Sequence, residues 1–95
     1  MNLYLCDDEQ KIRDELIQQI SVYLPEAEIT DFSSGKDLLD GLSVEGCDIL
    51  LLDIDMPGLS GMEVAARLLG LSRKPLLVFV TGHDELVYTR QSRLD

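Results

Sequence analysis

Residues 48–61 of the chain read DILLLDIDMPGLSG, and this stretch decides the fold. Residues 49–52 are continuously apolar, which is typical of a strand buried on both faces of a parallel sheet. The apolar run stops at Asp53, and Pro57 and Gly58 then favour a loop. A carboxylate at the carboxyl end of a central parallel strand lies where open α/β sheets bind their ligands. The sequence therefore indicates Asp53 as the chemical centre of the molecule.

The rest of the chain alternates strand and helix patterns around this stretch. Short apolar runs that end in polar or glycine residues predict strands, and apolar residues at helical spacing predict helices. The predicted strands are 2–6, 27–32, 48–53 and 76–80, and the predicted helices are 9–24, 36–42, one that begins at Ser60 or Gly61, and 84–93. Four successive strand–helix units predict an α/β fold, a doubly wound parallel sheet with helices on both faces.

The composition fits one small acidic domain. The 95 residues are 45% hydrophobic, and 18 acidic against 8 basic residues give a formal net charge of −10. This charge argues against direct nucleic-acid binding by the chain, because Lys and Arg bind the phosphate backbone. No apolar run approaches the roughly 18 residues of a membrane span, and the acidic N-terminus is unlike a signal peptide. We therefore expect a cytoplasmic protein in which Cys6 and Cys47 are reduced.

Acidic and hydroxyl side chains follow three of the predicted strands at the same edge of the sheet. Asp7 and Asp8 follow the first strand, Asp53 ends the third, and Thr81 follows the fourth. The first and third strands of a doubly wound sheet are neighbours, so the three carboxylates are expected to lie close together. Crowded carboxylates raise one another's pKa unless a cation enters, and their oxygens suit Mg²⁺ or Mn²⁺. A metal beside a carboxylate and a hydroxyl can transfer a phosphoryl group onto that carboxylate.

This combination of motifs resembles the receiver domain of bacterial two-component response regulators. The resemblance rests on Asp7, Asp8, Asp53, Met56, Pro57, Gly58, Gly61, Thr81 and Gly82. It covers residues 1 to about 88 and implies the flavodoxin-like strand order 2-1-3-4. Residues 80–85, VTGHDE, are similar to receivers that carry a LytTR-type DNA-binding output domain.

The resemblance implies a role for each carboxylate. Asp53 is expected to accept a phosphoryl group from a sensor histidine kinase or from a small acyl phosphate. Asp8 and Asp53 are expected to bind Mg²⁺ (or Mn²⁺) directly, and Asp7 mainly through water. The main-chain carbonyl of Asp55 is expected to be a further metal ligand.

The same resemblance places Thr81 and Gly82 beside the phosphoryl group. Thr81 is expected to hydrogen-bond this group and to shift when it arrives, and Gly82 to keep the approach to Asp53 open. The resemblance therefore implies that the chain is not an enzyme but a phosphoryl acceptor that can assist its own phosphorylation and dephosphorylation. It also implies that the chain controls a downstream DNA-binding output.

The chain departs from the receiver pattern towards its C-terminal end. A receiver continues with a fifth strand that carries a Lys before a cis-proline, and then with a fifth helix, but no Lys follows Lys74 here. We therefore expect residues 1–95 to form a C-terminally incomplete receiver domain without strand five and helix five. Phosphorylation of Asp53 should be slow or absent without that cation. The fourth strand would also be a bare sheet edge, which predicts self-association by strand pairing.

Two other functions fit parts of the sequence. A pseudo-receiver, an interaction module that keeps the fold but does not switch, would need neither metal nor phosphorylation. A haloacid-dehalogenase-like phosphatase also ends an apolar strand in Asp-x-Asp and carries a later Thr, here Asp53, Asp55 and Thr81, with Asp55 as the general acid. That fold also needs a Lys after the Thr, but no Lys follows Thr81 in this sequence, and 95 residues are too few for the fold. Metal binding and phosphorylation distinguish the receiver from the pseudo-receiver.

Overall fold

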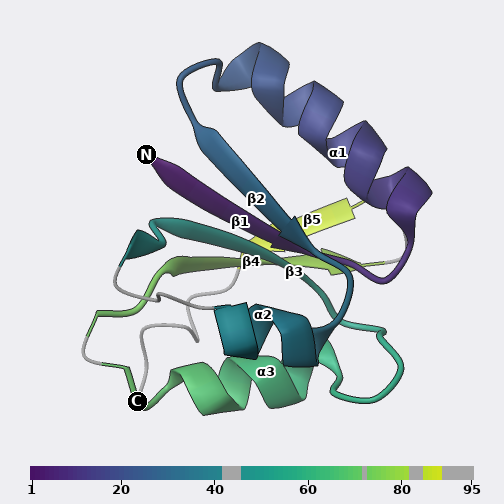
Figure 1. The fold of residues 1–95 in the computed structure, drawn as a ribbon, viewed down its shortest axis with the longest axis vertical. Helices are drawn as coiled ribbons and strands as arrows, with labels where there is room; N and C mark the ends of the chain where they lie inside the picture. Colours follow the sequence, from purple (N-terminus) through teal and green to yellow (C-terminus); the bar gives the residue numbers. More distant parts are fainter. Residues whose placement is uncertain (42–45, 72, 82–84, 89–95) are drawn as a thin grey trace.

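The computed structural model describes residues 1–41, 46–71, 73–81 and 85–88, and Figure 1 shows their arrangement. The elements in chain order are β1 (Asn2–Cys6), α1 (Gln10–Tyr23), β2 (Glu28–Phe32), α2 (Gly35–Gly41), β3 (Ile49–Asp53), α3 (Gly61–Leu68), β4 (Leu76–Thr81) and β5 (Glu85–Tyr88). The first seven confirm the predicted elements, and each boundary that was predicted from the sequence lies within one residue of the observed one. Within the described ranges, no helix is both long and apolar enough to span a membrane.

The strands form one sheet in the order β2-β1-β3-β4-β5. The pairs β1–β2, β1–β3 and β3–β4 are parallel, which confirms the predicted doubly wound sheet with order 2-1-3-4. In the register of these pairs, Cys6 lies opposite Leu52, and Asp53 lies opposite Val80. The carboxyl ends of the four parallel strands therefore share one edge of the sheet, and the residues that follow β1 and β3 are neighbours there.

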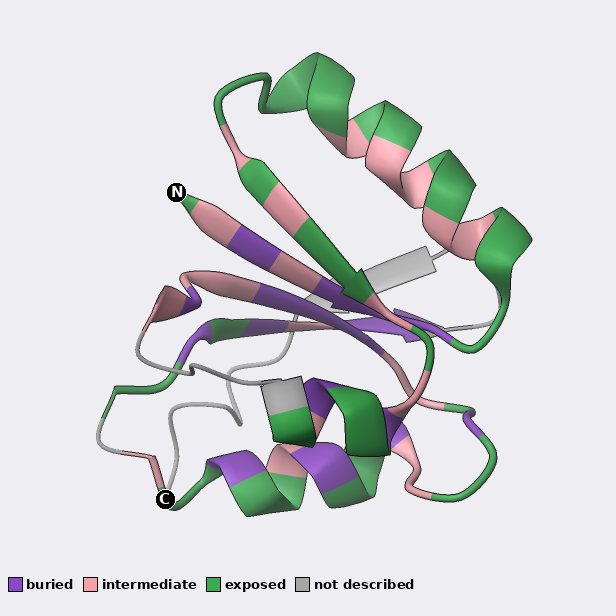
Figure 2. Cartoon of the chain, viewed as in Figure 1, coloured by how far each residue is buried: buried purple, intermediate pink, exposed green. Residues whose placement is uncertain are grey.

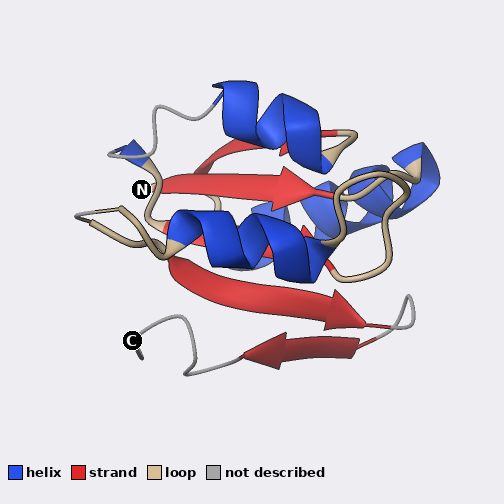
Figure 3. Cartoon of the chain, turned by 90° about the horizontal axis from the view of Figure 1, so that it is seen from below, coloured by secondary structure: helices blue, strands red, loops and turns tan. Residues whose placement is uncertain are grey.

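Residues 85–88 correct the prediction of a helix over 84–93. They form β5, which runs antiparallel beside β4 (Figure 3) with Val80 paired to Leu86. The sequence ELVY is rich in residues that favour strands, and the β4 edge offers backbone groups for pairing. The prediction of a bare β4 edge was therefore wrong. Self-association by pairing with β4 would need that edge to be free, but β5 occupies it. The rest of the predicted helix, 82–84 and 89–95, lies outside the described residues.

The sheet is covered on both faces, with α1 on one side and α2 and α3 on the other (Figure 1). Leu50 and Leu52 belong to the hydrophobic cluster that includes Leu38 and Val64 from α2 and α3. Leu51 between them belongs to the cluster on the α1 side. Successive side chains of a strand point to opposite faces, so the continuous apolar run of β3 is buried in both clusters. Figure 2 shows this burial in the central strands and on the inner sides of α2 and α3.

The start of α3 is fixed to the end of β3. The amide of Gly61 donates to the carbonyl of Ile54 at 2.9 Å. A Cβ atom at Gly61 would collide with the main-chain oxygen of Asp53, so this close approach requires glycine. Ser60 caps the helix: its Oγ accepts from the amide of Glu63 at 3.2 Å, and Glu63 Oε1 accepts from the amide of Ser60 at 3.1 Å. The capping box and the glycine contact together set the path of the loop that follows Asp53.

Candidate functional site

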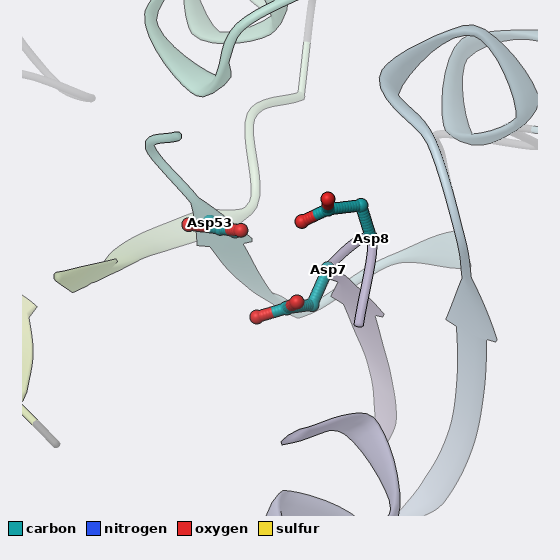
Figure 4. A group of neighbouring side chains, drawn as sticks. All are labelled: Asp7, Asp8 and Asp53. Atoms are coloured by element: carbon teal, nitrogen blue, oxygen red, sulfur yellow. The ribbon is translucent and has the colours of Figure 1, made fainter. Parts of the chain in front are cut away.

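Three carboxylates meet at the carboxyl edge of the sheet. Asp7 and Asp8 follow β1, and Asp53 ends the neighbouring strand β3. One carboxylate oxygen from each residue lies within 4.8 Å of those of the other two, and Figure 4 shows the three side chains gathered around the strand ends. Asp7 is 3% exposed, Asp53 is half-buried, and Asp8 is exposed to solvent. The structure thus brings the three predicted carboxylates into one cluster, which we call the acidic cluster, and solvent reaches it at Asp8.

Local hydrogen bonds fix the orientation of two of these carboxylates. Asp7 Oδ1 accepts from the amide of Glu9 at 2.8 Å. Asp53 Oδ1 accepts from the amide of Asp55 at 3.0 Å. In both bonds the aspartate carboxylate accepts from the backbone amide two residues further along the chain. This pattern stabilises a tight turn where a strand ends. The turns after β1 and β3 therefore hold Asp7 and Asp53 in defined positions instead of leaving them free to rotate.

Burial makes the charged state of this cluster costly. It raises the pKa of Asp53 from 3.8 to about 6, and the charges of Asp7 and Asp8 act in the same direction, against the opposing hydrogen bond from the Asp55 amide. Burial also raises the pKa of Asp7, again with the charge of Asp8 adding to it. A divalent cation bound between the carboxylates would remove this repulsion. The acidic cluster is therefore the set of described residues that fits an oxygen-binding metal such as Mg²⁺.

The other predicted site residues lie around this cluster or outside the described part of the chain. Asp55 is exposed in the loop after β3 and supplies the amide that bonds Asp53. Thr81 ends β4, one residue beyond the partner of Asp53 in the sheet register, so its backbone reaches the same edge. Gly82 lies outside the described residues. Beneath the cluster, the thiol of Cys6 contacts Met56 Sδ at 3.6 Å, which packs the loop after β3 against β1.

Arg13 is a residue of the site that the sequence interpretation missed. It lies on α1, and its Nη1 donates to the main-chain carbonyl of Asp7 at 2.8 Å. Its Nε donates to Asp31 Oδ2 on β2 at 3.0 Å, and the Arg13 side chain is only 13% exposed. The available signal was an arginine in the first turn of the helix that follows Asp7, but its partner Asp31 is 18 residues away in the sequence.

Residues 3–93 match the family model described as the response regulator receiver domain. The positive alginate biosynthesis regulatory protein of Pseudomonas aeruginosa is 39% identical, over 90% of this chain and 35% of its own length. Sensory transduction protein LytT of Bacillus subtilis is 31% identical, also over 90% of this chain and 35% of its own length. The chain therefore spans about a third of these curated relatives. The match to LytT confirms the similarity to receivers of the LytTR type that was expected from residues 80–85.

A solved structure with the same fold is that of response regulator protein TrrA from Thermotoga maritima in complex with Mg(2+)-BeF. It is 30% identical, with a TM-score of 0.69, over 86% of this chain and 71% of that one. A complex of histidine kinase ThkA with response regulator protein TrrA also matches, at 27% identity and a TM-score of 0.73, over 88% of this chain and 71% of that one. From the family match, the relatives and the fold together, this chain belongs to the response regulator receiver domain family.

Proposed function

We propose that this chain is the phosphoryl-accepting switch of a two-component system, with Asp53 as the acceptor. The observation that carries the proposal is the acidic cluster, in which Asp53 lies with Asp7 and Asp8 at a solvent-accessible edge of the sheet. Membership of the receiver family supports it. The phosphoryl donor is a sensor histidine kinase, and the complex of TrrA with the kinase ThkA supports a partner of this class.

The same cluster would hold Mg²⁺, or Mn²⁺ in its place. Asp8 and Asp53 supply carboxylate ligands, Asp7 acts mainly through water, and the main-chain carbonyl of Asp55 completes the protein ligands. The raised pKa values of Asp7 and Asp53 support this role, since a bound cation would stabilise both carboxylates. When bound, the ion would neutralise charge that builds up on the transferred phosphoryl group. The complex of TrrA with Mg(2+)-BeF supports the choice of metal.

Phosphoryl transfer requires Asp53 to be ionised and correctly aimed. A carboxylate oxygen of Asp53 forms a bond to phosphorus, and the bond between phosphorus and the donor's imidazole nitrogen breaks. The products are an aspartyl phosphate and an imidazole that takes a proton from solvent. The amide of Asp55 holds Asp53 Oδ1, so the carboxylate is oriented before the donor arrives. Thr81 and Gly82 are the proposed contacts of the arriving phosphoryl group, with Thr81 as the residue that shifts.

The proposed consequence of phosphorylation is control of a DNA-binding output in a longer cytoplasmic protein. The relatives are regulatory proteins about three times as long as the matched segment, which leaves room for such an output. The net charge of −10 supports a division of labour in which this chain receives the signal and another segment binds DNA. The receiver is then an acceptor that assists its own phosphorylation and dephosphorylation, and catalysis for other substrates is not part of its role.

A phosphorylation time course tests this function. The chain is incubated with phosphoramidate, a small donor with a phosphorus–nitrogen bond, with and without Mg²⁺, and its intact mass is followed. We expect slow formation of one Mg²⁺-dependent phosphoryl adduct on the native chain and none on Asp53→Asn. Asp55→Asn is the matched control, because it neutralises a neighbouring exposed carboxylate and keeps the backbone. An adduct of equal yield on Asp53→Asn, or one that forms equally in EDTA, would contradict the proposal.

A further inference from the structure

Arg13 joins three elements directly behind the acidic cluster. It belongs to α1, its Nη1 bonds the carbonyl of Asp7 at the end of β1, and its Nε bonds the carboxylate of Asp31 on β2. The two donor–acceptor distances are 2.8 and 3.0 Å. The planar guanidinium is thus engaged on two sides at once, and only 13% of the Arg13 side chain is exposed. Such a two-sided arrangement fixes an arginine far better than a single surface ion pair.

The carbonyl that Arg13 binds lies in the peptide that links Asp7 to Asp8. This peptide joins the two residues of the turn that belong to the acidic cluster, so its position affects how their carboxylates lie relative to Asp53. On its other side, Asp7 is held by the amide of Glu9 through Oδ1. Asp7 also donates its amide to the carbonyl of Phe32 at 3.1 Å. Arg13 is therefore a further anchor of the turn, and it acts on the main-chain carbonyl of Asp7, whereas Glu9 acts on the side chain.

We propose that Arg13 is a positioning residue for the metal site, and that Asp31 orients the Arg13 guanidinium. This inference rests on the proposed function, because it concerns the affinity of the acidic cluster for Mg²⁺. Outer groups that orient metal ligands typically change metal affinity by 10- to 100-fold when they are removed. Arg13 acts on a main-chain carbonyl next to the ligands, so we expect an effect at the lower end, about tenfold.

The sign of the effect separates positioning from simple electrostatics. Arg13 carries a positive charge close to the cluster, and this charge repels a divalent cation. If charge were its only influence, Arg13→Met would bind Mg²⁺ more tightly than the native chain. If Arg13 holds the turn in place, Arg13→Met binds Mg²⁺ more weakly despite the lost repulsion. Arg13→Lys adds a second distinction, because it keeps the charge but cannot reproduce the two-sided contact of a guanidinium.

The test is isothermal titration of Mg²⁺ into the native 95-residue chain and four variants. We expect Arg13→Met to bind Mg²⁺ about tenfold more weakly than the native chain. Arg13→Lys should bind it at least about threefold more weakly, which is half of the tenfold loss on a logarithmic scale. Asp31→Ala should lose less affinity than Arg13→Met. Arg73→Met is the matched control, because Arg73 Nη2 pairs with Asp48 Oδ1 at 3.0 Å. Asp48 directly precedes β3, so this ion pair lies at the amino ends of the parallel strands, away from the acidic cluster. Its affinity should stay within about twofold of the native value. Far-ultraviolet circular dichroism establishes that each titrated variant is folded.

Asp31→Ala keeps the inference testable if Arg13→Met does not fold. The Asp31 side chain is 43% exposed, so Asp31→Ala perturbs mainly the surface. It leaves Arg13 in place but removes the carboxylate that binds the Arg13 Nε. Unchanged or tighter Mg²⁺ binding in Arg13→Met, or full rescue by Arg13→Lys, would overturn the positioning role. If Arg13→Met is unfolded, unchanged binding in Asp31→Ala would overturn it. A native chain without Mg²⁺ binding would overturn the proposed function and this inference together, whereas normal native binding with unaffected variants overturns this inference alone.

Discussion

Asp53 is held in a state that costs free energy in the metal-free chain. Its pKa is raised from 3.8 to about 6, with burial as the main cause and the charges of Asp7 and Asp8 as further causes. Because the pKa in the folded chain lies above its ordinary value, the protonated form is the one that folding favours. The contribution of Asp53 to stability is therefore complete below about pH 4 and is lost as pH rises through about 6. The residue proposed as phosphoryl acceptor is thus a source of instability at neutral pH.

The first prediction concerns this cost. In EDTA at pH 7.5, Asp53→Asn should be more stable than the native chain by about 1 kcal/mol, a value that allows for solvent screening at a half-buried site. At pH 4 the gain should largely vanish, because the native Asp53 is then mostly protonated and has no charge to lose. Thermal unfolding at both pH values measures the difference, with Asp55→Asn as the control. An equal gain at pH 4 and pH 7.5 would show that the effect is not ionisation.

Gly61 gives the second prediction at the scale of one residue. A Cβ at this position would collide with the main-chain oxygen of Asp53 and lie 2.8 Å from Ile54 Cα, both of which are backbone atoms. Gly61→Ala should therefore cost about 3 kcal/mol of unfolding free energy and displace the acceptor. At Gly70 the nearest atom would be 4.0 Å away, so Gly70→Ala should stay within about 0.5 kcal/mol of the native chain. Urea unfolding compares the two, and similar losses in both would refute the explanation.

At the scale of elements, the N-terminus of α3 sets the loop after Asp53. The third prediction is that Ser60→Ala destabilises the chain by about 1 kcal/mol, because it removes the hydroxyl that accepts from the Glu63 amide. The control is Ser33→Ala, since the contact of the Ser33 hydroxyl with Asp37 is long, at 3.4 Å, and exposed to solvent. Urea unfolding midpoints of the two variants give the comparison. A loss in Ser33→Ala as large as in Ser60→Ala would argue against a specific capping role.

The elements also show what the sequence can and cannot predict. The run at 49–52 predicts a strand buried on both faces because each of its side chains is apolar, and the structure places alternate residues in two clusters. Residues 85–88 offer only Leu86 and Val87 as adjacent apolar residues, and two neighbours do not define a helical or strand period. Their state is decided by pairing with β4, a contact between separate elements that a local pattern does not contain.

The residues of the site also differ in how far the sequence alone could predict them. Asp7, Asp8 and Asp53 could be predicted to meet because each follows a strand, and the strand order brings those strands together. Arg13 could not be predicted, because its bonds depend on how α1 crosses the ends of β1 and β2. Ligand candidates at strand ends are therefore visible in the sequence, whereas the groups that orient them require the packed structure.

At the scale of the whole molecule, a net charge of −10 makes cation binding a stabilising event. The fourth prediction is that Mg²⁺ at ten times its dissociation constant raises the unfolding free energy by about 1.4 kcal/mol. NaCl of equal ionic strength should give less, because it only screens the surface charge. Asp8→Asn should lose the additional effect of Mg²⁺ and keep the effect of NaCl. Equal stabilisation by the two salts would mean that Mg²⁺ has no specific site.

The central claim is that Asp53 carries the phosphoryl group, and locating the adduct tests it most directly. The chain is treated with acetyl phosphate and Mg²⁺, the acyl phosphate is reduced with borohydride, and peptides are analysed by mass spectrometry. Reduction converts a phosphorylated aspartate to homoserine, so the modified residue is marked permanently. We predict homoserine at residue 53, dependent on Mg²⁺ and absent at Asp7, Asp8 and Asp55. A folded, Mg²⁺-binding chain with no homoserine, or with homoserine at another aspartate, would contradict the claim and favour a module that does not switch through Asp53.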